Sequence, residues 1–388
     1  MKNILYITTY YTKYTVNFFN NLKKIKNLNF IFAYPNLKKN IKINSHSDFS
    51  IKEKKIFNYF EDKYEICYYK LYGLDNLIKK YKPKIVVVHN KHILNFFLNE
   101  KLIKLKKEIG FQIYYRTIPY LIPQNKSSLS KFYNGKNFFK KFILNLKIID
   151  LIVFKYYKFI FQKVDHFLTY VPQGQKIIKS YGIKNKNITT VYNTVDTFEL
   201  DKIEKKLKKK TKKKYDIIYV GSLSRWKKVE LLIEVAESLK KKYKIKILIV
   251  GDGFNKLKYM NMVKKKKLKN NILFEGSVHN KRKLYKLLKQ SKIFVLPGPG
   301  GLAINEAMHA GLPIICSKAD GTEKFLVKNK INGFFFKENS SLDLHKKLSS
   351  ILQNKKLLIS LGKNSKKIIN NNFNSHLINK NYEKAFKL

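Results

Sequence analysis

Short apolar segments typical of buried strands alternate with helical segments along most of this chain of 388 residues. The first part contains "NILYIT", "NFIFAYP", "KIVVVHN", "FQIYYRT", "DHFLTYV" and "NITTVYN". Consecutive strands that are separated by helices run parallel, and a parallel sheet needs helices on both of its faces. The alternation therefore predicts an α/β fold and excludes all-helical and all-β architectures.

The alternation is interrupted by the charged segment "DKIEKKLKKKTKKKYD" (201–216), which has no apolar period. It then restarts with "DIIYVGS", "KIKILIVGDG", "NILFEGSV", "KIFVLPG", "LPIICS" and "GFFF". The chain is also too long for one ordinary core. We predict two doubly wound, Rossmann-like domains at 1–200 and 215–388, a Lys-rich linker at 201–214, and a ligand cleft between the domains. The last helix is expected to be able to return to the first domain.

The formal net charge is +55, from 81 Lys and Arg against 26 Asp and Glu. Lysines are spread along the whole chain instead of forming one stripe, and Asn, Ile, Phe and Tyr, which also have AT-rich codons, are abundant. Codon bias is therefore the preferred explanation, and no specific nucleic acid is expected as a partner. The charge still favours an anionic membrane surface. Only Arg116, Arg225 and Arg282 are arginines, and the planar fork of Arg suits phosphate.

The location predicted for the protein is the cytoplasm, peripheral on the inner face of the cell membrane. Cys67 and Cys316 lie far apart and indicate neither a metal site nor a disulfide framework. No apolar run reaches the roughly 18 residues of a membrane span, and the N-terminal run is too short for a signal peptide. Segment 137–164 mixes aromatics with lysines. It is either an interfacial helix with Phe154 and Ile160 in lipid, or a core helix with a solvated lysine face.

The window "LPGPGGLAINEAMHAGLPIICS" (296–317) contains no Lys or Arg and a single acid, Glu306. It follows a predicted strand and opens a helix, whose N-terminal N–H groups suit a phosphate. Glu306 lies about one turn further and can accept hydrogen bonds from a ribose diol. We attribute the missing lysines to the space that a nucleotide needs. The alternative is an ordinary helix start with an exposed Glu.

Other strand ends should meet at the same edge of the sheet, since the carboxyl ends of parallel strands gather there. "GSLSRWKK" places Arg225 and Lys227 on one such loop, and "VGDG" ends another strand. The candidates for binding a donor nucleotide are Gly221, Ser222, Gly251, Asp252, Gly253, Val278, Gly298, Gly300, Gly301, Leu302, Ala303 and Glu306.

From about Asp216 to about Lys337 the chain resembles the nucleotide-sugar domain of the retaining GT-B glycosyltransferases called family 4, or glycosyl transferases group 1. "YVGSLSRWKKVELLIEVA", "ILIVGDG", "FEGSV", "KIFVLP", "GLAINEAMHAGLPIICS" and "NGFFF" occur in the order and spacing of that family. The resemblance implies two facing Rossmann-like domains. It also implies transfer of a sugar, with retention, from a nucleoside-diphosphate sugar to a hydroxyl, without metal or another cofactor.

The resemblance also implies roles for particular residues. Glu306 matches the second glutamate of the family motif and would bind the donor ribose, and Lys227 matches the phosphate lysine. The first glutamate falls on Gly298, which has no side chain. Ser222 stands where many relatives carry Arg, and Arg225 is the candidate replacement. Lys227, Arg225 and Glu306 are therefore the predicted catalytic residues.

The first domain is expected to bind the acceptor, a glycan or polyprenyl-linked molecule, in bacterial surface polysaccharide or lipopolysaccharide synthesis. Its candidate acceptor residues are Tyr10, Tyr11, Thr12, His89 and Arg116. His279 and His309 are expected to have no role. Two other classes stay open: a sugar-nucleotide epimerase of the same fold, which would act without an acceptor, and a basic nucleic-acid-binding protein.

Overall fold

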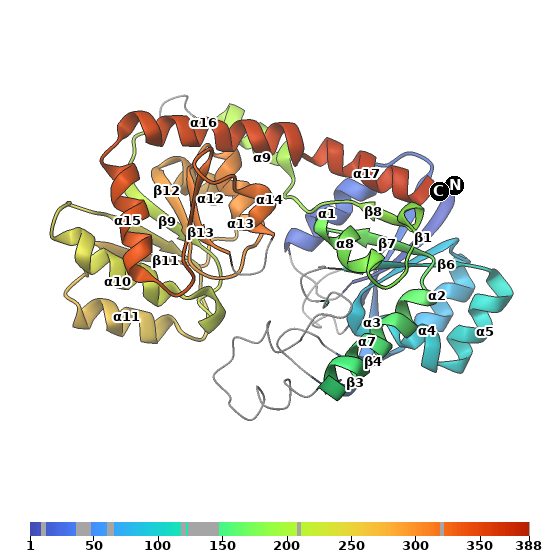
Figure 1. The fold of residues 1–388 in the computed structure, drawn as a ribbon. Coiled ribbons are helices and arrows are strands. Elements are labelled where there is room, and N and C mark those ends of the chain that lie inside the picture. Colours follow the sequence, from blue (N-terminus) through green and yellow to red (C-terminus); the bar gives the residue numbers. More distant parts are fainter. Residues whose placement is uncertain are drawn as a thin grey trace. The chain divides into compact units, whose positions relative to one another are not determined.

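The chain divides into two compact units in the computed structural model, which describes residues 1–8, 13–35, 48–59, 66–117, 122, 147–207, 211–318 and 322–387. Unit 1 comprises Met1–Tyr192 and Ile378–Leu388, and unit 2 comprises Asn193–Leu377. Each unit is a Rossmann-like α/β domain built on its own sheet (Figure 1). The predicted fold class is confirmed.

The described part of unit 1 contains an eight-stranded sheet in the order β4-β3-β2-β1-β5-β6-β7-β8. All neighbours pair in parallel except β3 and β4, which are antiparallel. The strands are β1 (Lys2–Ile7), β2 (Leu28–Pro35), β3 (Asp48–Tyr59), β4 (Ile66–Tyr72), β5 (Ile85–Val88), β6 (Gln112–Thr117), β7 (His166–Thr169) and β8 (Ile188–Thr190). Because β5 is buried along its whole length, its sequence, IVVV, is entirely apolar.

Helices cover both faces of this sheet. They are α1 (Lys13–Leu22), α2 (Leu74–Tyr81), α3 (Asn90–Ile93), α4 (Asn95–Leu98), α5 (Glu100–Ile109), α7 (Lys147–Gln162), α8 (Gln173–Lys179) and, later in the chain, α17 (Ser375–Lys387). One hydrophobic core lies between the sheet and α2, α5 and α7. The other lies between the opposite face and α1 with α17.

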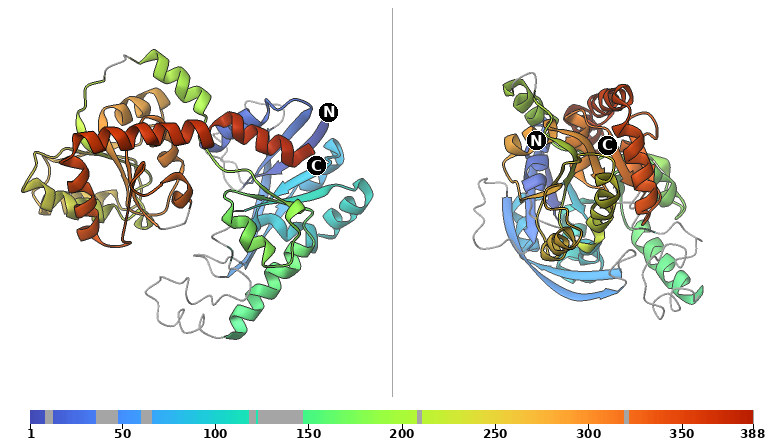
Figure 2. Two further views of the ribbon diagram at one scale, coloured as in Figure 1. Left: turned by 45° about the horizontal axis from the view of Figure 1, so that its top comes forward. Right: turned by 90° about the vertical axis from the view of Figure 1, so that its left-hand side faces the viewer.

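Helix α17 brings the last part of the chain back to the first strands (Figure 2). The Phe386 side chain is fully buried, with its ring centroid 5.6 Å from that of Phe30 and 5.8 Å from that of Tyr114. Lys2 Nζ donates a hydrogen bond of 2.8 Å to the backbone oxygen of Phe386. This helix therefore completes a core that the first strands begin.

The hairpin of β3 and β4 is absent from the sequence prediction. In β3 the inward-facing side of the strand carries Glu53, which binds Lys91 at 2.7 Å and His92 at 2.6 Å. A charged residue at an inward position breaks the alternation of apolar and polar residues by which a strand is recognised. Lys91 and His92 lie on α3, so they come close to Glu53 only in the folded chain.

The described part of unit 2 contains a six-stranded parallel sheet in the order β11-β10-β9-β12-β13-β14. The strands are β9 (Tyr215–Val220), β10 (Ile247–Val250), β11 (Ile272–Gly276), β12 (Ser291–Leu296), β13 (Ile314–Ser317) and β14 (Gly333–Phe336). Its helices are α9 (Thr197–Lys206), η4 (Arg225–Lys227), α10 (Val229–Lys240), α11 (Lys256–Lys265), α12 (Lys281–Lys289), α13 (Leu302–His309), α14 (Glu323–Leu326), α15 (Ser341–Leu352) and α16 (Lys355–Asn372).

The predicted linker is wrong over most of its described residues. The chain crosses into unit 2 at Asn193, and residues Thr197–Lys206 form α9, capped by the Asp196 carboxylate, which accepts from the Glu199 N–H. The inward face of α9 has few apolar residues, with Thr197 and Leu200 buried, and Glu204 adds ion pairs with Lys289 and Lys366. Of the described residues of the predicted linker, 207 and 211–214 lie outside regular structure.

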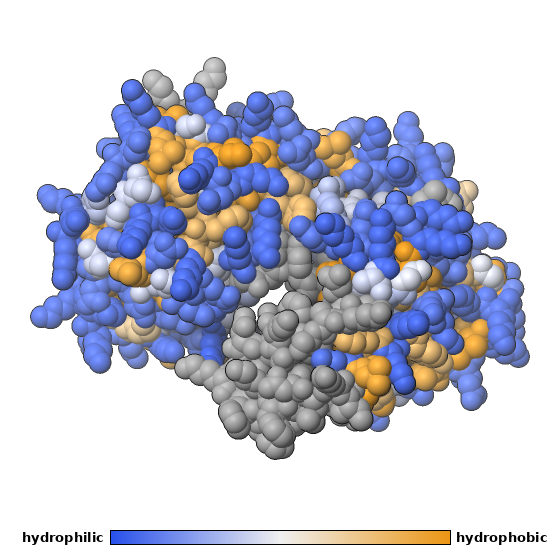
Figure 3. Space-filling model, in the orientation of Figure 1, coloured by the Kyte–Doolittle hydropathy of each residue, from blue (hydrophilic) through white to orange (hydrophobic). Residues whose placement is uncertain are grey.

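Hydrophilic side chains cover most of the face seen in Figure 3, as the lysine content requires. Among the described residues, no helix is both long and apolar enough to span a membrane. Helix α7 lies within the segment considered for membrane contact. Ile160 is fully buried and Phe154 packs against the core, so these two residues face the protein and the proposed lipid contact through them is wrong.

The packing of α17 predicts that Phe386→Ala destabilises unit 1 selectively, by roughly 3–5 kcal/mol. Denaturation is followed by far-ultraviolet circular dichroism for the whole chain and by fluorescence of Trp226, the single tryptophan, for unit 2. We expect part of the dichroism transition to move to lower denaturant while the Trp226 transition stays in place. Ile359→Ala, at an exposed position of α16, is the control and should change neither. A shift confined to Trp226 would contradict the assignment of α17 to unit 1.

Candidate functional site

The strand order of unit 2 fixes where a ligand has to bind. Strand β9 lies between β10 and β12, so the connections that follow β9 and β12 leave on opposite faces of the sheet. In open parallel sheets, ligands bind at this switch point, beyond the carboxyl ends of the strands. The loops that meet here are those after β9 and β12, which contain Lys227 and the glycines of the 296–317 window.

Glycines let three loops at this edge touch backbone to backbone. A Cβ on Gly251 would lie 1.8 Å from the Gly221 oxygen, and one on Gly253 would lie 2.8 Å from the Leu223 nitrogen. Both have positive φ, 143° and 157°, which L side chains rarely adopt. A Cβ on Gly298 would lie 2.1 Å from the Trp226 oxygen. The predicted glycines are therefore structural requirements of the loop contacts.

Lys227 lies where a phosphate-binding cation is expected. Its Nζ donates to the carbonyl of Pro299 at 2.8 Å and to that of Gly300 at 3.4 Å. It would also lie 3.9 Å from a Cβ on Gly301, the residue before α13. The ammonium group therefore lies beside the N-terminus of α13, and two sources of positive potential converge there.

The other donor candidates are less closely gathered. Arg225 and Ser222 are exposed on the loop after β9, and the Ser222 hydroxyl lies 3.2 Å from that of Ser224. The exposed Asp252 is paired with Lys256 at 2.7 Å. The hydrogen bond from Lys256, followed by one from the Gly253 N–H, lowers the pKa of Asp252. Val278 is partly buried between β11 and α12.

Glu306 is buried, with 2% of its surface exposed, so the alternative of an exposed Glu at an ordinary helix start is wrong. From Ile304 to His309 every residue of α13 is buried, and so are the inner residues of β12 and β13 on either side of it in sequence. Burial of these elements explains the missing lysines of the window better than space for a nucleotide does. Lysine is excluded from such positions because its ammonium must stay in water.

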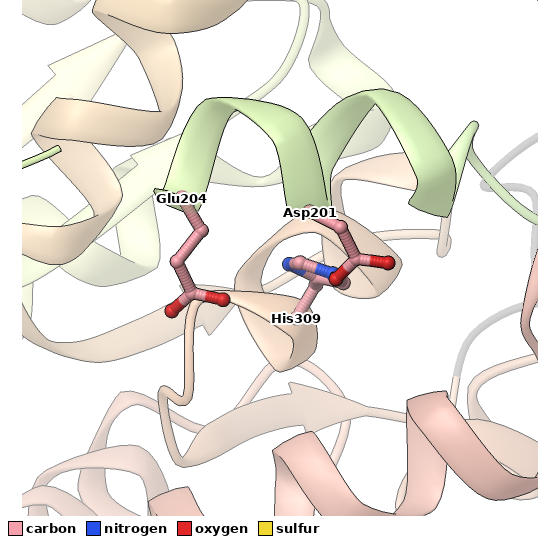
Figure 4. Close-up of side chains that lie close together, drawn as sticks. All are labelled: Asp201, Glu204 and His309. Atoms are coloured by element: carbon pink, nitrogen blue, oxygen red, sulfur yellow. The ribbon is translucent and has the colours of Figure 1, made fainter. Parts of the chain in front are cut away.

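Three groups that could hold a metal ion, Asp201, Glu204 and His309, lie together on α9 and α13 (Figure 4). His309 Nε2 lies 3.0 Å from Asp201, and its Nδ1 lies 3.0 Å from the Tyr285 hydroxyl. Glu204 binds two lysines, at 3.1 Å and 2.6 Å. With both ring nitrogens engaged and two ammonium groups adjacent, the cluster serves to fasten α9 to unit 2.

Two of the five acceptor candidates lie in the described part of unit 1, and Tyr10, Tyr11 and Thr12 lie outside the described residues. Arg116, in β6, is 6% exposed, and His89 directly follows β5. Burial, and next the charge of Arg116, hold the pKa of His89 well below its ordinary value of 6.5, so it is neutral at pH 7. Both residues lie at the carboxyl edge of the unit 1 sheet.

Residues 201–368 match the family of glycosyl transferases group 1. The match begins within α9 and covers the whole sheet of unit 2, so unit 2 is similar to the domains of that family. An uncharacterized glycosyltransferase of Methanocaldococcus jannaschii is 27% identical over 242 residues, which cover 59% of this chain and 60% of that protein. One of Haemophilus influenzae is 27% identical over 200 residues, 50% and 54% of the two chains. The chain thus spans little more than half the length of these relatives.

Solved glycosyltransferase structures share the fold. Sucrose-phosphate synthase from Thermosynechococcus elongatus has a TM-score of 0.71 at 16% identity, over 100% of this chain and 98% of that one. TarM of S. aureus, in complex with UDP among other ligands, has a TM-score of 0.70 at 15% identity, and HepE of Anabaena with UDP has 0.65 at 12%, both over the full length of each chain. These similarities support the fold that the sequence predicts.

The contact of Gly298 with η4 predicts that no side chain fits there. Gly298→Ala should lower the stability of unit 2 by about 1–3 kcal/mol, because its Cβ meets backbone that cannot rotate away. Gly298→Glu, which restores the family glutamate, should lose at least as much stability and gain no turnover. Thermal melts measure the first effect. Gly301→Ala is the control, because its extended backbone and 3.9 Å clearance accept a methyl group. A large gain in turnover for Gly298→Glu would instead mark the chain as a damaged copy of the family pattern.

The His309 cluster predicts acid sensitivity of unit 2. Burial lowers the pKa of His309 from 6.5, and Asp201 opposes this only in part. The unfolded chain therefore binds a proton that the folded unit excludes, so stability is complete above pH 6.5 and falls as the pH decreases through the folded pKa. The slope reaches at most about 1.4 kcal/mol per pH unit. His309→Gln, which does not titrate, should show a shallower loss of Trp226-detected stability between pH 7 and 5. Equal slopes for the two proteins would remove His309 as the cause.

Proposed function

We propose that the protein is a glycosyltransferase that moves a sugar from a nucleoside-diphosphate sugar, with UDP as the first nucleotide to test, to a hydroxyl of a glycan or lipid-linked acceptor. The observation that supports the proposal most is the position of Lys227 Nζ beside the α13 N-terminus, at the switch point of the unit 2 sheet. Ammonium and helix N-terminus together suit a diphosphate. Two of the solved structures with a similar fold contain UDP, which makes UDP the first nucleotide to test.

In the proposed reaction the glycosidic bond of the donor breaks and its electron pair passes to the β-phosphate oxygen. Lys227 and the N–H groups of Gly301, Leu302 and Ala303 stabilise the charge that develops there, so the protein itself supplies the positive potential. The acceptor oxygen forms the new bond to the sugar and passes its proton to the departing diphosphate. Retention of configuration is part of the proposal through the family 4 resemblance.

Glu306 is proposed to bind the donor ribose, and Arg225, exposed on the same loop as Lys227, is proposed to assist the diphosphate. A buried carboxylate suits the first role, because its hydrogen bonds to two hydroxyls strengthen where water is excluded. Ser222, Asp252 and Val278 are proposed as outer parts of the nucleotide site. A large side chain at Gly298 would displace the loop that carries Lys227.

The acceptor is proposed to bind unit 1, and the enzyme to work on the inner face of a membrane in surface polysaccharide synthesis. On α7, Leu151, Ile152 and Phe159 are 52%, 50% and 48% exposed. Lys155 and Lys158 are exposed between them, and Lys163 Nζ lies 4.5 Å from the Phe159 ring centroid. Exposed apolar side chains interleaved with lysines suit the interface of an anionic bilayer.

Two substitutions separate the proposed roles in unit 2. Glu306→Gln keeps the shape of the side chain but should weaken UDP binding roughly 10- to 150-fold, since charge-assisted hydrogen bonds contribute about 1.5–3 kcal/mol. Lys227→Ala should mainly lower turnover, because its charge acts most strongly as the diphosphate departs. Calorimetric titration of UDP and steady-state rates measure the two effects.

The matched control is Lys256→Ala, which removes the same charge from a partly exposed position at the same sheet edge. If the Glu306→Gln variant binds UDP as tightly as the wild type, Glu306 does not bind the ribose. Turnover of a nucleotide sugar without any acceptor would favour the epimerase over the glycosyltransferase.

The exposed face of α7 predicts binding to anionic vesicles. Leu151→Ser with Phe159→Ser should reduce co-sedimentation with phosphatidylglycerol vesicles roughly tenfold or more, because two half-exposed apolar side chains no longer enter the interface. High salt should reduce binding of the wild type. Leu342→Ser, on α15 of unit 2, is the control for loss of an exposed apolar side chain. Equal binding to neutral and anionic vesicles would contradict the electrostatic part.

A further inference from the structure

The sheet of unit 1 has a switch point of its own. Strand β1 lies between β2 and β5, so the carboxyl ends of β1, β5 and β6 border the place where such sheets bind ligands. Thr8 follows β1, Arg116 is the second-last residue of β6, and Tyr170 follows β7. Polar residues of three strands therefore meet at this edge, on a unit for which the family match gives no residue.

Arg116 is a buried cation enclosed by aromatic rings. The carbon of its guanidinium lies 4.4 Å from the ring centroid of Tyr170, 5.0 Å from that of Phe18 and 5.8 Å from that of Tyr6. Its Nε is buried and has no hydrogen-bond partner. Within the described part of the chain, no carboxylate forms an ion pair with it. Stacking on aromatic rings offsets only part of the cost of removing such a charge from water.

The neighbours of the guanidinium include two tyrosine hydroxyls, and the Tyr382 hydroxyl interacts with both Tyr6 and Arg116. The Tyr6 and Tyr382 hydroxyls are buried and neither has a partner in good hydrogen-bond geometry; Thr8 Oγ1, at the end of β1, is also buried and unpartnered. Tyr6 and Tyr382 both lie close enough to Arg116 for its charge to lower the pKa of each hydroxyl, although burial raises both more strongly. Buried polar atoms without partners are rare in folded proteins, so several at one sheet edge indicate a ligand.

The chemistry of this cluster selects the ligand. A guanidinium and phenol hydroxyls donate hydrogen bonds, and nothing in the cluster supplies a negative charge. His89, with its lowered pKa, adds no second positive charge. The complement is a small oxyanion with several acceptor oxygens, and arginine binds phosphate in a forked geometry that lysine cannot provide.

We propose that Arg116, with the hydroxyls of Tyr6 and Tyr382, binds a phosphate group at the carboxyl edge of the unit 1 sheet. If the proposed function holds, this group belongs to the acceptor, so the acceptor is a phosphorylated molecule. The binding site itself does not depend on that function, because it is defined by residues of unit 1.

The first test measures phosphate binding to the full chain by equilibrium dialysis at a salt concentration that suppresses non-specific attraction. Arg116→Gln is compared with Arg282→Gln, which removes the same charge from an exposed position of α12. We expect affinity for inorganic phosphate to fall at least tenfold in Arg116→Gln and to stay at the wild-type level in Arg282→Gln. Equal affinities in the two variants overturn the proposal.

Lys227→Ala separates this site from the proposed donor site. Phosphate binding that survives in Lys227→Ala and is lost in Arg116→Gln lies in unit 1. The reverse pattern places the phosphate beside α13 and overturns the inference while leaving the proposed function intact. Butyl phosphate distinguishes the source: tighter Arg116-dependent binding of the ester supports the phosphate of a larger acceptor, and binding of inorganic phosphate alone supports a free-phosphate site and overturns the acceptor assignment.

Tyr6→Phe keeps the test decisive if Arg116→Gln fails to fold. It removes a buried hydroxyl that has no partner in good hydrogen-bond geometry, so the melting temperature without phosphate should stay the same or rise, while phosphate affinity falls about three- to tenfold. Tyr285→Phe is the contrast, because its hydroxyl is bonded to His309: it should lose stability and keep phosphate affinity. Unchanged phosphate affinity in Tyr6→Phe, or a lowered melting temperature without phosphate, overturns the role of this hydroxyl.

Discussion

Backbone contact between three loops is the constraint on which the carboxyl edge of unit 2 depends. Residues 251, 253 and 298 lie so close to the neighbouring loops that a methyl group at any of them would overlap backbone atoms. This close packing holds η4 against the loop after β12 and so brings the Lys227 ammonium to the start of α13. The position of the Lys227 ammonium thus depends on the absence of side chains at these three glycines.

The strand–helix alternation predicted the architecture well, because burial on both faces makes parallel strands such as β5, β10 and β13 almost purely apolar. The predictions failed where charged residues form buried or partly buried ion pairs that stabilise a strand or a helix. In β3 the inward Glu53 conceals the alternation, and in α9 the ion pairs of Glu204 with Lys289 and Lys366 add to the few apolar contacts of the helix. Such pairs join residues far apart in sequence, so the pattern along the chain does not contain them.

At the site, the glycine loops and Lys227 could be placed from the sequence because a strand followed by a helix fixes which end of the sheet a loop lies on. The burial of Glu306 could not, since it depends on how completely α13 is enclosed. One signal was available: in a chain this rich in lysine, a window of 25 residues without one marks an interior segment. The same reasoning explains why the buried cation of unit 1 is an arginine. A buried lysine readily loses its proton, whereas a guanidinium keeps its charge.

The return of α17 to unit 1 has a consequence for the order in which the protein acquires its structure during synthesis. A ribosome that has completed β1 to β8 has made the strands that the structure describes in the unit 1 sheet, but one face of that sheet lacks Tyr382 and Phe386. All of unit 2 is translated before these residues emerge. Unit 2, whose residues are contiguous, can fold as soon as it leaves the ribosome, so the part of the chain made first is the part completed last.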